Sequence, residues 1–336
     1  MPKMISFHEF LPQNKCQQGF TLLEMLLVIA LMGMLALSAT ALVDNLDEQE
    51  RFETTRTRLQ QIKTAIIGDT SRTLNGEPMI SGFVADMGRL PANIEELVEL
   101  PSAGNEWGED VLDYQGVSDV KIVKISLYGG SRGPYLDVLP SSGTSAVRAF
   151  RDGWGNPDEV GKASDFGWNV SAVSPVFSIQ SYGSDAALGG TGVYEADYPS
   201  TINLIELDDY QVNLSGVSVH VNFNQAPAAD RTPLRLRIYS LQDGVLQTPY
   251  ESNSFTHGAS SVAPTVATFP AVNKSLLLGK HAILITCYDG DDTPATVTSD
   301  KVYDGDCDGN NLHTSPYYFN LLPRSQLPTI PWIITP

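Results

Sequence analysis

The chain has 336 residues, of which 42% are hydrophobic and 18% are charged, so it is long enough to form two domains of ordinary size. Its formal net charge is −18. Binding to nucleic acid needs a basic face, and no run rich in Lys or Arg occurs, so the composition excludes a nucleic-acid partner. An acidic balance suits an exported surface or one that attracts cations.

The chain contains 3 cysteines, Cys16, Cys287 and Cys307. A cut between Cys16 and the apolar run that follows it would leave Cys287 and Cys307 as an even pair. An exported protein with one disulfide has this pattern. The alternative is two unpaired, buried thiols.

The first predicted element is an apolar helix over residues 20–43, in which Glu24 is the only charged residue. A helix of this length spans about 36 Å, enough to cross a hydrocarbon core of about 30 Å. A secretory signal peptide has a shorter apolar core with a cleavage site after it, and no such site follows here. Lys3 and Lys15 favour a cytoplasmic leader, although Arg residues after the run weaken this signal.

The word Gly19-Phe20-Thr21-Leu22-Leu23-Glu24 resembles the processing site of type IV pilins and type II secretion pseudopilins. In that family a prepilin peptidase cuts after the glycine and the new amino-terminal phenylalanine is N-methylated. The resemblance thus implies a leader over residues 1–19, with Gly19 and Phe20 as the processing and methylation residues. The alternative is a plain signal anchor that carries a chance acid.

The resemblance also gives Glu24 a role in assembly, because in the family this glutamate is thought to pair with the amino-terminal nitrogen of a neighbouring subunit. A carboxylate inside a membrane is tolerated when an opposite charge is supplied. The implied partners are the prepilin peptidase, other pilin or pseudopilin subunits and an inner-membrane assembly platform.

The helical pattern continues beyond the apolar run, and we expect one long helix over residues 20–75. Phe52, Leu59, Ile62 and Ile66 recur at helical spacing and form one apolar stripe. No proline interrupts this stretch. The helix would lie half in lipid and half against a globular domain.

Residues 76–208 resemble the major pseudopilin of type II secretion, in which a long helix packs on a small antiparallel sheet. The resemblance is carried by "MGRLPANIEELVEL", "GPYL", "DGWGNP" and "FSIQSYGSDAALGGTG", which occur in the family's order, with extra residues between some of them. Residues 176–181 alternate apolar and polar and predict a strand.

The same resemblance implies a Ca²⁺ site in the loop after this strand, where the candidates are Ser184, Asp185, Glu195 and Asp197. Ca²⁺ prefers six to eight oxygen ligands, which acidic, Gly-rich loops can supply. The family's adjacent acidic pair is not reproduced, because Ala196 separates Glu195 from Asp197. The alternative is an ordinary solvated loop.

Residues 209–336 change to repeated apolar–polar alternation, which predicts an all-β, sandwich-like module. The expected strands lie at residues 217–223, 234–238, 282–288 and 316–322. In the second of them Leu234, Leu236 and Ile238 alternate with Arg235 and Arg237. Together with the preceding parts, the predicted fold is α+β: a long transmembrane helix on a small antiparallel sheet, followed by this module.

The module contains "YDGDCDGNN", in which Asp304, Asp306 and Asp308 precede Gly309 as in the start of an EF-hand loop. The position of the bidentate Glu is taken by Ser315, so a full EF-hand is not expected. We expect either a partial Ca²⁺ loop beside a Cys287–Cys307 bridge or a solvated acidic turn.

The sequence offers no pattern for catalysis. It lacks a G-x-S-x-G elbow, a phosphate-binding G-x-x-x-x-G-K-[ST] loop and any H-x-x-x-H or Cys/His zinc pattern. The expected function is therefore structural: a low-copy subunit of a type IV pilus-like or type II secretion pseudopilus filament. It would be a single-pass inner-membrane protein with periplasmic domains, and extracellular once assembled. The alternatives are a filament-borne adhesin that binds a surface, a sugar or an exported protein, and a membrane-anchored enzyme.

Overall fold

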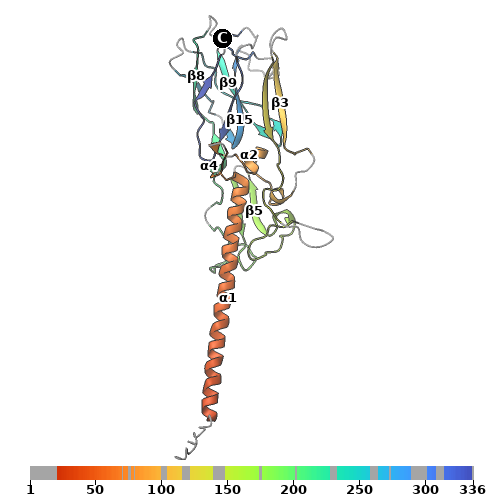
Figure 1. Ribbon diagram of the computed structural model, residues 1–336, viewed down its shortest axis with the longest axis vertical. Coiled ribbons are helices and arrows are strands. Elements are labelled where there is room, and N and C mark those ends of the chain that lie inside the picture. Colours follow the sequence, from red (N-terminus) through yellow and green to blue (C-terminus); the bar gives the residue numbers. More distant parts are fainter. Residues whose placement is uncertain are drawn as a thin grey trace, which may run out of the picture. The chain divides into compact units, whose positions relative to one another are not determined.

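The structure is a computed structural model (Figure 1), which describes most of the residues after residue 20. It describes residues 21–69, 71–74, 77–78, 80–99, 104–115, 122–138, 148–173, 176–200, 203–227, 233–257, 264–271, 274–288, 301–307 and 314–334. Gly19, Phe20 and Asp308 lie outside these residues. The chain divides into two compact units, residues 1–50 and 51–336.

One helix dominates the amino-terminal part of the chain. Helix α1 covers Leu22–Ile67, 46 residues in all. The predicted end at residue 75 is wrong, because the backbone turns at Gly68 with φ +92°. A side chain there would collide with the carbonyl oxygen of Ser81, so glycine is required at this helix end.

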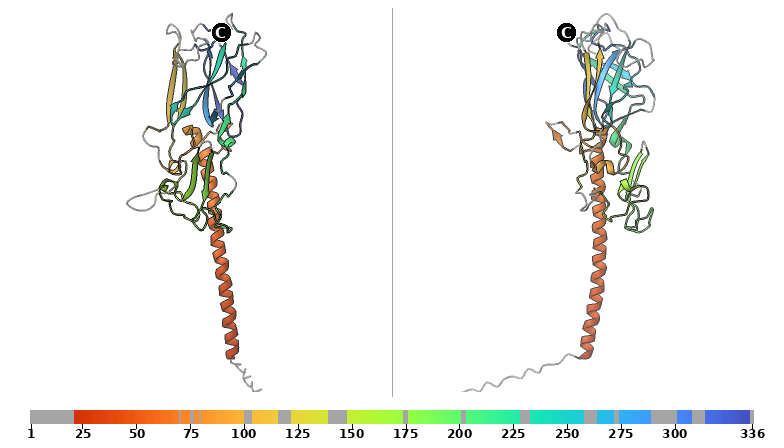
Figure 2. Two further views of the ribbon diagram at one scale, coloured as in Figure 1. Left: turned by 180° about the vertical axis from the view of Figure 1, so that it is seen from behind. Right: turned by 90° about the vertical axis from the view of Figure 1, so that its right-hand side faces the viewer.

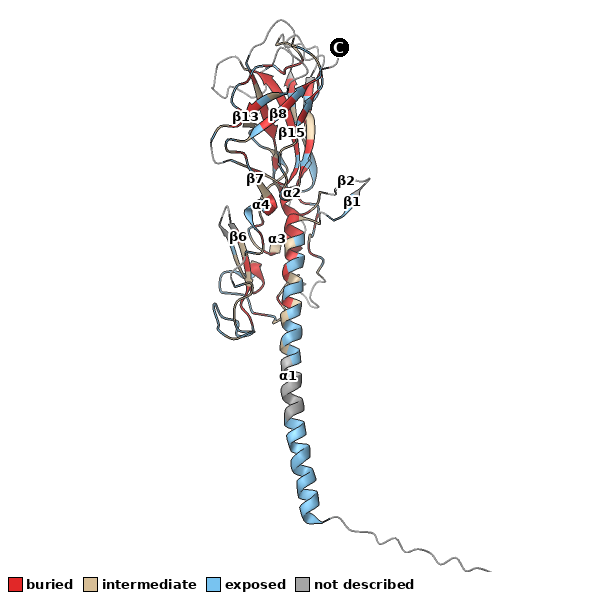
Figure 3. Cartoon of the chain, turned by 90° about the vertical axis from the view of Figure 1, so that its left-hand side faces the viewer, coloured by how far each residue is buried: buried red, intermediate tan, exposed pale blue. Residues whose placement is uncertain are grey.

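The last turns of α1 carry the predicted apolar stripe, and Figure 3 shows buried residues in this part of the helix. Leu59, Ile62 and Ile66 are almost completely buried, as expected. Their hydrophobic cluster includes residues of α2 (Phe83–Met87), α3 (Glu95–Val98) and the antiparallel hairpin of β5 (Trp168–Val173) and β6 (Val176–Ser181). The predicted strand over 176–181 is confirmed. Figures 1 and 2 show this hairpin beside α1.

The "DGWGNP" segment, residues 152–157, fixes a loop against α1. Asp152 is buried and its carboxylate accepts hydrogen bonds from the backbone N–H groups of Gly155 and Asn156, at 2.8 and 3.1 Å. It also accepts hydrogen bonds from the Asn156 amide and the Ser181 hydroxyl, at 2.8 and 2.5 Å. The backbone N–H of Gly153 donates to Thr55 Oγ1 on α1 at 2.9 Å.

Replacement of this acid by its amide should weaken the fold. In Asp152→Asn an NH₂ group would face donors that the carboxylate now accepts, and we expect a loss of about 3 kcal/mol in the free energy of unfolding. Chemical denaturation of the variant and the wild type measures this difference. Asp158→Asn is the matched control, because Asp158 is an exposed acid directly after the same segment. An equal loss of unfolding free energy in both variants would contradict the role of the Asp152 carboxylate in holding this loop.

Two sheets form the core of the carboxyl-terminal region. The four-stranded sheet has the order β12-β9-β15-β16, and the three-stranded sheet has the order β13-β8-β17, with β17 parallel to β8. Four of these strands agree with the predicted strands apart from their ends: β8 (Ser218–Phe223), β9 (Leu234–Tyr239), β15 (Gly279–Cys287) and β16 (Tyr317–Leu321). The remaining strands are β12 (Tyr250–Glu251), β13 (Thr265–Thr268) and β17 (Ile330–Trp332).

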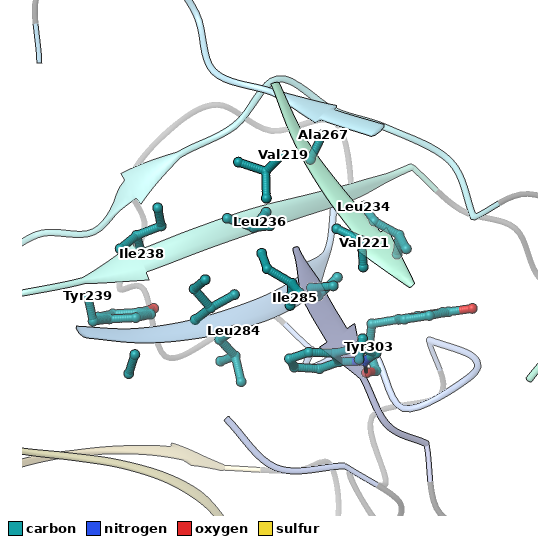
Figure 4. Packing of buried hydrophobic residues seen from close by; sticks show 14 of the residues in the cluster. Val219, Val221, Leu234, Leu236, Ile238, Tyr239, Ala267, Leu284, Ile285 and Tyr303 are labelled. Carbon is teal, nitrogen blue, oxygen red and sulfur yellow. Dashed lines mark hydrogen bonds between the residues drawn. The ribbon is translucent and has the colours of Figure 1, made fainter. Parts of the chain in front are cut away.

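A hairpin from the middle of the chain covers the other face of the four-stranded sheet. It is formed by β3 (Gly108–Gln115) and β4 (Ile122–Gly129). Its Tyr114, Ile125 and Leu127 are fully buried in the same hydrophobic cluster as the carboxyl-terminal strands. Figure 4 shows Tyr239 and Leu284 on the opposite side of their strands from Val219.

In a two-layer sandwich, alternation would place the arginines of β9 on a face open to solvent. Because the hairpin covers this face, the arginines are not on a solvent face. Arg237 is 6% exposed, and its Nε lies 2.8 Å from Glu251 Oε1. The hairpin that covers Arg237 belongs to residues predicted for the pilin-like part. The core of the carboxyl-terminal region thus extends beyond residues 209–336.

The remaining elements connect these parts. They are α4 (Leu207–Tyr210), a 3₁₀ turn (Ala163–Asp165) and three short antiparallel pairs: β1 (Thr73–Leu74) with β2 (Glu77–Pro78), β7 (Gln211–Asn213) with β14 (Ser275–Leu277), and β10 (Leu241–Gln242) with β11 (Val245–Leu246). The predicted α+β class is confirmed, with several small and mostly antiparallel sheets.

Candidate functional site

The amino-terminal turn of α1 is built from Thr21 and Glu24. Thr21 precedes the helix, and its Oγ1 accepts a hydrogen bond from the backbone N–H of Glu24 at 3.3 Å. Its carbonyl oxygen accepts hydrogen bonds from the N–H groups of Glu24 and Met25 at 3.0 and 3.2 Å. Thr-x-x-Glu is the pattern of a capping box, and an acid in the first turn is also favoured by the helix dipole. Thr21 thus caps the first turn of α1 through its hydroxyl, which binds the backbone N–H of Glu24.

Apolar side chains follow Glu24 on every side of the helix. All residues from 21 to 37 are exposed, including Leu22 at 83%, Leu23 at 78% and Leu26 at 63%. A helix that is apolar all round is normally surrounded by lipid or by other protein. In the part of the chain that the structure describes, no helix is both long enough and apolar enough to be assigned as a membrane span.

The first candidate Ca²⁺ loop lies between β6 and α4. Asp197 Oδ2 accepts a hydrogen bond from the backbone N–H of Gly189 at 3.1 Å, while its buried Oδ1 has no hydrogen-bond partner among the described residues. Asp185 is exposed and accepts a hydrogen bond from the N–H of Ala187 at 3.1 Å. Glu195 is also exposed.

The second candidate loop contains Asp304, which is buried, and Asp306, which is half-buried. Beside it the structure pairs Cys287, at the end of β15, with Cys307 as a disulfide, with Cα atoms 6.0 Å apart. Within the described ranges, no three His, Cys, Asp or Glu side chains gather into a metal-binding group. Oxygen donors suited to Ca²⁺ are present in both loops, but the described carboxylates do not converge on one point.

One comparison with known proteins decides the class of the amino terminus. The family model for the prokaryotic N-terminal methylation motif matches residues 14–40, which include Gly19, Phe20 and Glu24. The chain carries a type IV pilin-like, prepilin-type amino terminus. This motif implies processing by a prepilin peptidase and assembly with pilin subunits, and it points to a structural subunit rather than an enzyme.

The match covers only residues 14–40 of the chain. No curated protein and no solved structure matches the chain. The likeness of residues 76–208 to the major pseudopilin therefore rests on their sequence words alone, and the carboxyl-terminal module has no matched relative.

A buried acid that no sequence pattern indicated lies on α2. Asp86 is 3% exposed, its Oδ1 lies 3.3 Å from Arg132 Nε, and its Oδ2 accepts a hydrogen bond from the Tyr135 hydroxyl at 3.2 Å. Burial raises the pKa of this carboxyl to about 6, while Arg132 and Tyr135 act in the opposite direction. The Arg132 guanidinium in turn lies 3.8 Å over the Trp107 ring.

The raised pKa of Asp86 predicts a pH-dependent stability. Its folded-state pKa, about 6, exceeds the ordinary value of 3.8, so the folded state binds the proton more tightly than the unfolded state. This group's contribution to the free energy of unfolding is present below pH 3.8 and falls as the pH rises to about 6, by about 3 kcal/mol in total.

Replacing Asp86 by an amide, which does not titrate, should remove its contribution to the pH dependence of the free energy of unfolding. We expect the stability of Asp86→Asn relative to the wild type to increase by about 2–3 kcal/mol between about pH 4 and pH 7. Denaturation curves across this range measure the difference. A constant difference at every pH would show that the pKa of Asp86 is not raised.

Proposed function

We propose that the chain is a low-copy structural subunit of a filament of the type IV pilus or type II secretion pseudopilus kind. The single observation that carries the proposal is the prepilin-type word Gly19-Phe20 with Glu24 four residues after Phe20, inside the matched motif and ahead of an exposed apolar helix. The subunit would be made with its leader, held in the inner membrane and then extracted into the filament.

Cleavage after Gly19 would create a positively charged amino group on Phe20 of every subunit. Glu24 supplies the opposite charge, and two such charges cost much less in an apolar surrounding when they pair than when they are separate. Since the nitrogen that pairs with Glu24 belongs to a neighbour, each pair sets the axial position of one subunit against the next.

The apolar side chains of residues 22–37 support a membrane anchor before assembly. A contiguous apolar surface of this extent is unfavourable in water, and lipid or neighbouring helices would cover it. We therefore propose residues 20–43 as the span that holds the precursor in the inner membrane, with the remaining parts in the periplasm. The inner-membrane assembly platform would act on this helix.

The substitution Gly19→Ala tests the proposal. The peptidase cleft must admit the backbone at this position, and we expect the variant to accumulate as a precursor of full length. Gly33→Ala is the matched control, because Gly33 lies inside α1 and a Cβ at that position meets no atom within 4 Å. Normal maturation of the Gly19→Ala chain would refute the filament proposal.

The carboxyl-terminal sheets make this subunit bulkier than a helix on one small sheet, which favours a low-copy or tip position. A deletion strain scored for both protein export and piliation separates the machines: loss of export alone assigns the subunit to secretion, and loss of piliation alone assigns it to a pilus.

The second candidate is an adhesin, favoured by the separate core of the carboxyl-terminal sheets. If the deletion strain forms intact filaments that no longer attach to surfaces, the adhesin candidate is supported.

Ca²⁺ and a disulfide are further parts of the proposal. The unpartnered Oδ1 of Asp197 supports Ca²⁺ in the first loop, and the pairing of Cys287 with Cys307 supports a bridge beside the second. Thermal melts with and without a chelator test the metal. An unchanged melting temperature would remove both Ca²⁺ sites from the proposal.

A further inference from the structure

The described part of residues 51–336 contains two hydrophobic clusters that do not merge. One surrounds the last turns of α1 and also includes Tyr210 and Leu278 of the carboxyl-terminal region, and the other fills the carboxyl-terminal sheets with the β3–β4 hairpin. A small cavity of about 60 Å³ lies between α2 and the strands that follow, and its lining includes the polar side chains of Ser240, Gln242, Gln247 and His281. The boundary between the clusters, which we call the seam, is thus partly polar.

Arg89, which follows α2, forms the first ionic contact across the seam. Its Nη1 and Nη2 lie 2.8 and 3.1 Å from the two carboxylate oxygens of Glu96, and its Nε lies 2.6 Å from Asp243 Oδ1. Asp243 belongs to the turn between β10 and β11, and its N–H donates to the Met87 carbonyl at 2.8 Å. Asp243 and Gly244 have φ values of +51° and +78° and form the Asp-Gly turn that suits a two-residue hairpin loop.

Asp209 on α4 forms the second ionic contact. It accepts hydrogen bonds from Lys63 Nζ on α1 at 3.3 Å and from Arg324 Nε at 2.8 Å. Arg324 lies between β16 and β17, and its Nη2 also contacts Glu206 Oε2 at 2.9 Å. The φ of Arg324 is +56°, in the left-handed region, which is costly for an arginine.

We infer that the seam is a salt-sensitive joint, at which salt loosens the ionic contacts between the carboxyl-terminal region and the residues packed around the last turns of α1, while the core of the carboxyl-terminal sheets stays closed. Water reaches the ionic contacts of Asp243 and Arg324, since 33% and 63% of their side-chain surfaces are exposed. Salt screens such contacts but leaves the buried apolar cores intact.

Hydrogen exchange followed by mass spectrometry of the full-length protein in detergent micelles tests this joint. Exchange is compared at about 0.05 M and about 1 M NaCl, between which the Debye length falls from more than 10 Å to about 3 Å. We expect peptides over residues 207–213 and 240–246 to exchange about three- to tenfold faster at high salt. Peptides over residues 234–239 and 281–287, which lie in the core sheet, should not change.

Variants separate the ionic contacts from other effects of salt. Arg324→Gln and Arg89→Gln should each raise exchange in the seam peptides at low salt and reduce the further effect of high salt. The matched control is Lys162→Gln, which removes an ion pair with Glu159 of 2.9 Å outside the seam. Seam peptides that are as protected as the core at both salt concentrations, or that respond equally to Lys162→Gln, would overturn the inference.

Discussion

A Glu24→Ala subunit is expected to be cleaved and methylated normally and yet to be nearly absent from filaments. The charged amino group of the neighbouring subunit would then enter an apolar surrounding without a partner. Loss of one member of a buried charge pair costs about 3–5 kcal/mol, which corresponds to a reduction in incorporation of more than about a hundredfold. Quantitative immunoblots of sheared filaments against whole cells measure this ratio.

The position of Glu24 in the first turn of α1 makes a second variant essential. Glu24→Gln keeps the size of the side chain but removes its charge. If the charge sets the position of the subunit, the Gln and Ala variants fail alike. Incorporation of the Gln variant at the wild-type level would mean that the charge of Glu24 is not needed, and the assembly role would be wrong. Glu48→Ala, in the same helix, controls for the loss of an acid as such.

An isolated fragment of residues 209–336 is expected not to form a stable fold. Without β3 and β4, one face of the four-stranded sheet would expose Tyr239 and Leu284 and leave Arg237 open to water. Burying Tyr114, Ile125 and Leu127 of the hairpin contributes about 1.5–3 kcal/mol for each side chain. That sum is a large part of the stability of a domain of ordinary size.

Near-ultraviolet circular dichroism and binding of a hydrophobic dye measure the state of this fragment. A fragment of residues 104–336 retains the hairpin and is the matched control. We expect fixed aromatic packing in the longer fragment only. A cooperative unfolding transition in the 209–336 fragment would show that the module is autonomous and that the hairpin is peripheral to it.

The strands that follow a local pattern could be predicted from the sequence. In β8, Val219, Val221 and Phe223 are buried and alternate with exposed residues, so the period of two identifies the strand. The hairpin was missed because β3 carries Glu109, Asp110 and Asp113, which weaken its alternation. Its place on a sheet more than a hundred residues later has no local sequence signal.

The candidate site residues also divide into those that a local sequence pattern indicates and those that depend on contacts distant in the sequence. Glu24 could be singled out as a candidate because Gly19, Phe20 and the apolar run lie next to it in the sequence. The partners of Asp209 could not, because Lys63 and Arg324 lie 146 and 115 residues away. The buried position of Asp86 also depends on tertiary contacts, with Arg132 and Tyr135 from the segment after β4.

Determination of the mature amino terminus by mass spectrometry tests the central claim most directly. Protein isolated from cells that contain the prepilin peptidase should begin at Phe20 and carry one added methyl group on its amino nitrogen. Residues 1–19, including Cys16, should be absent from it. A mature chain that still begins at Met1, or that is cut after the apolar run, would contradict the account.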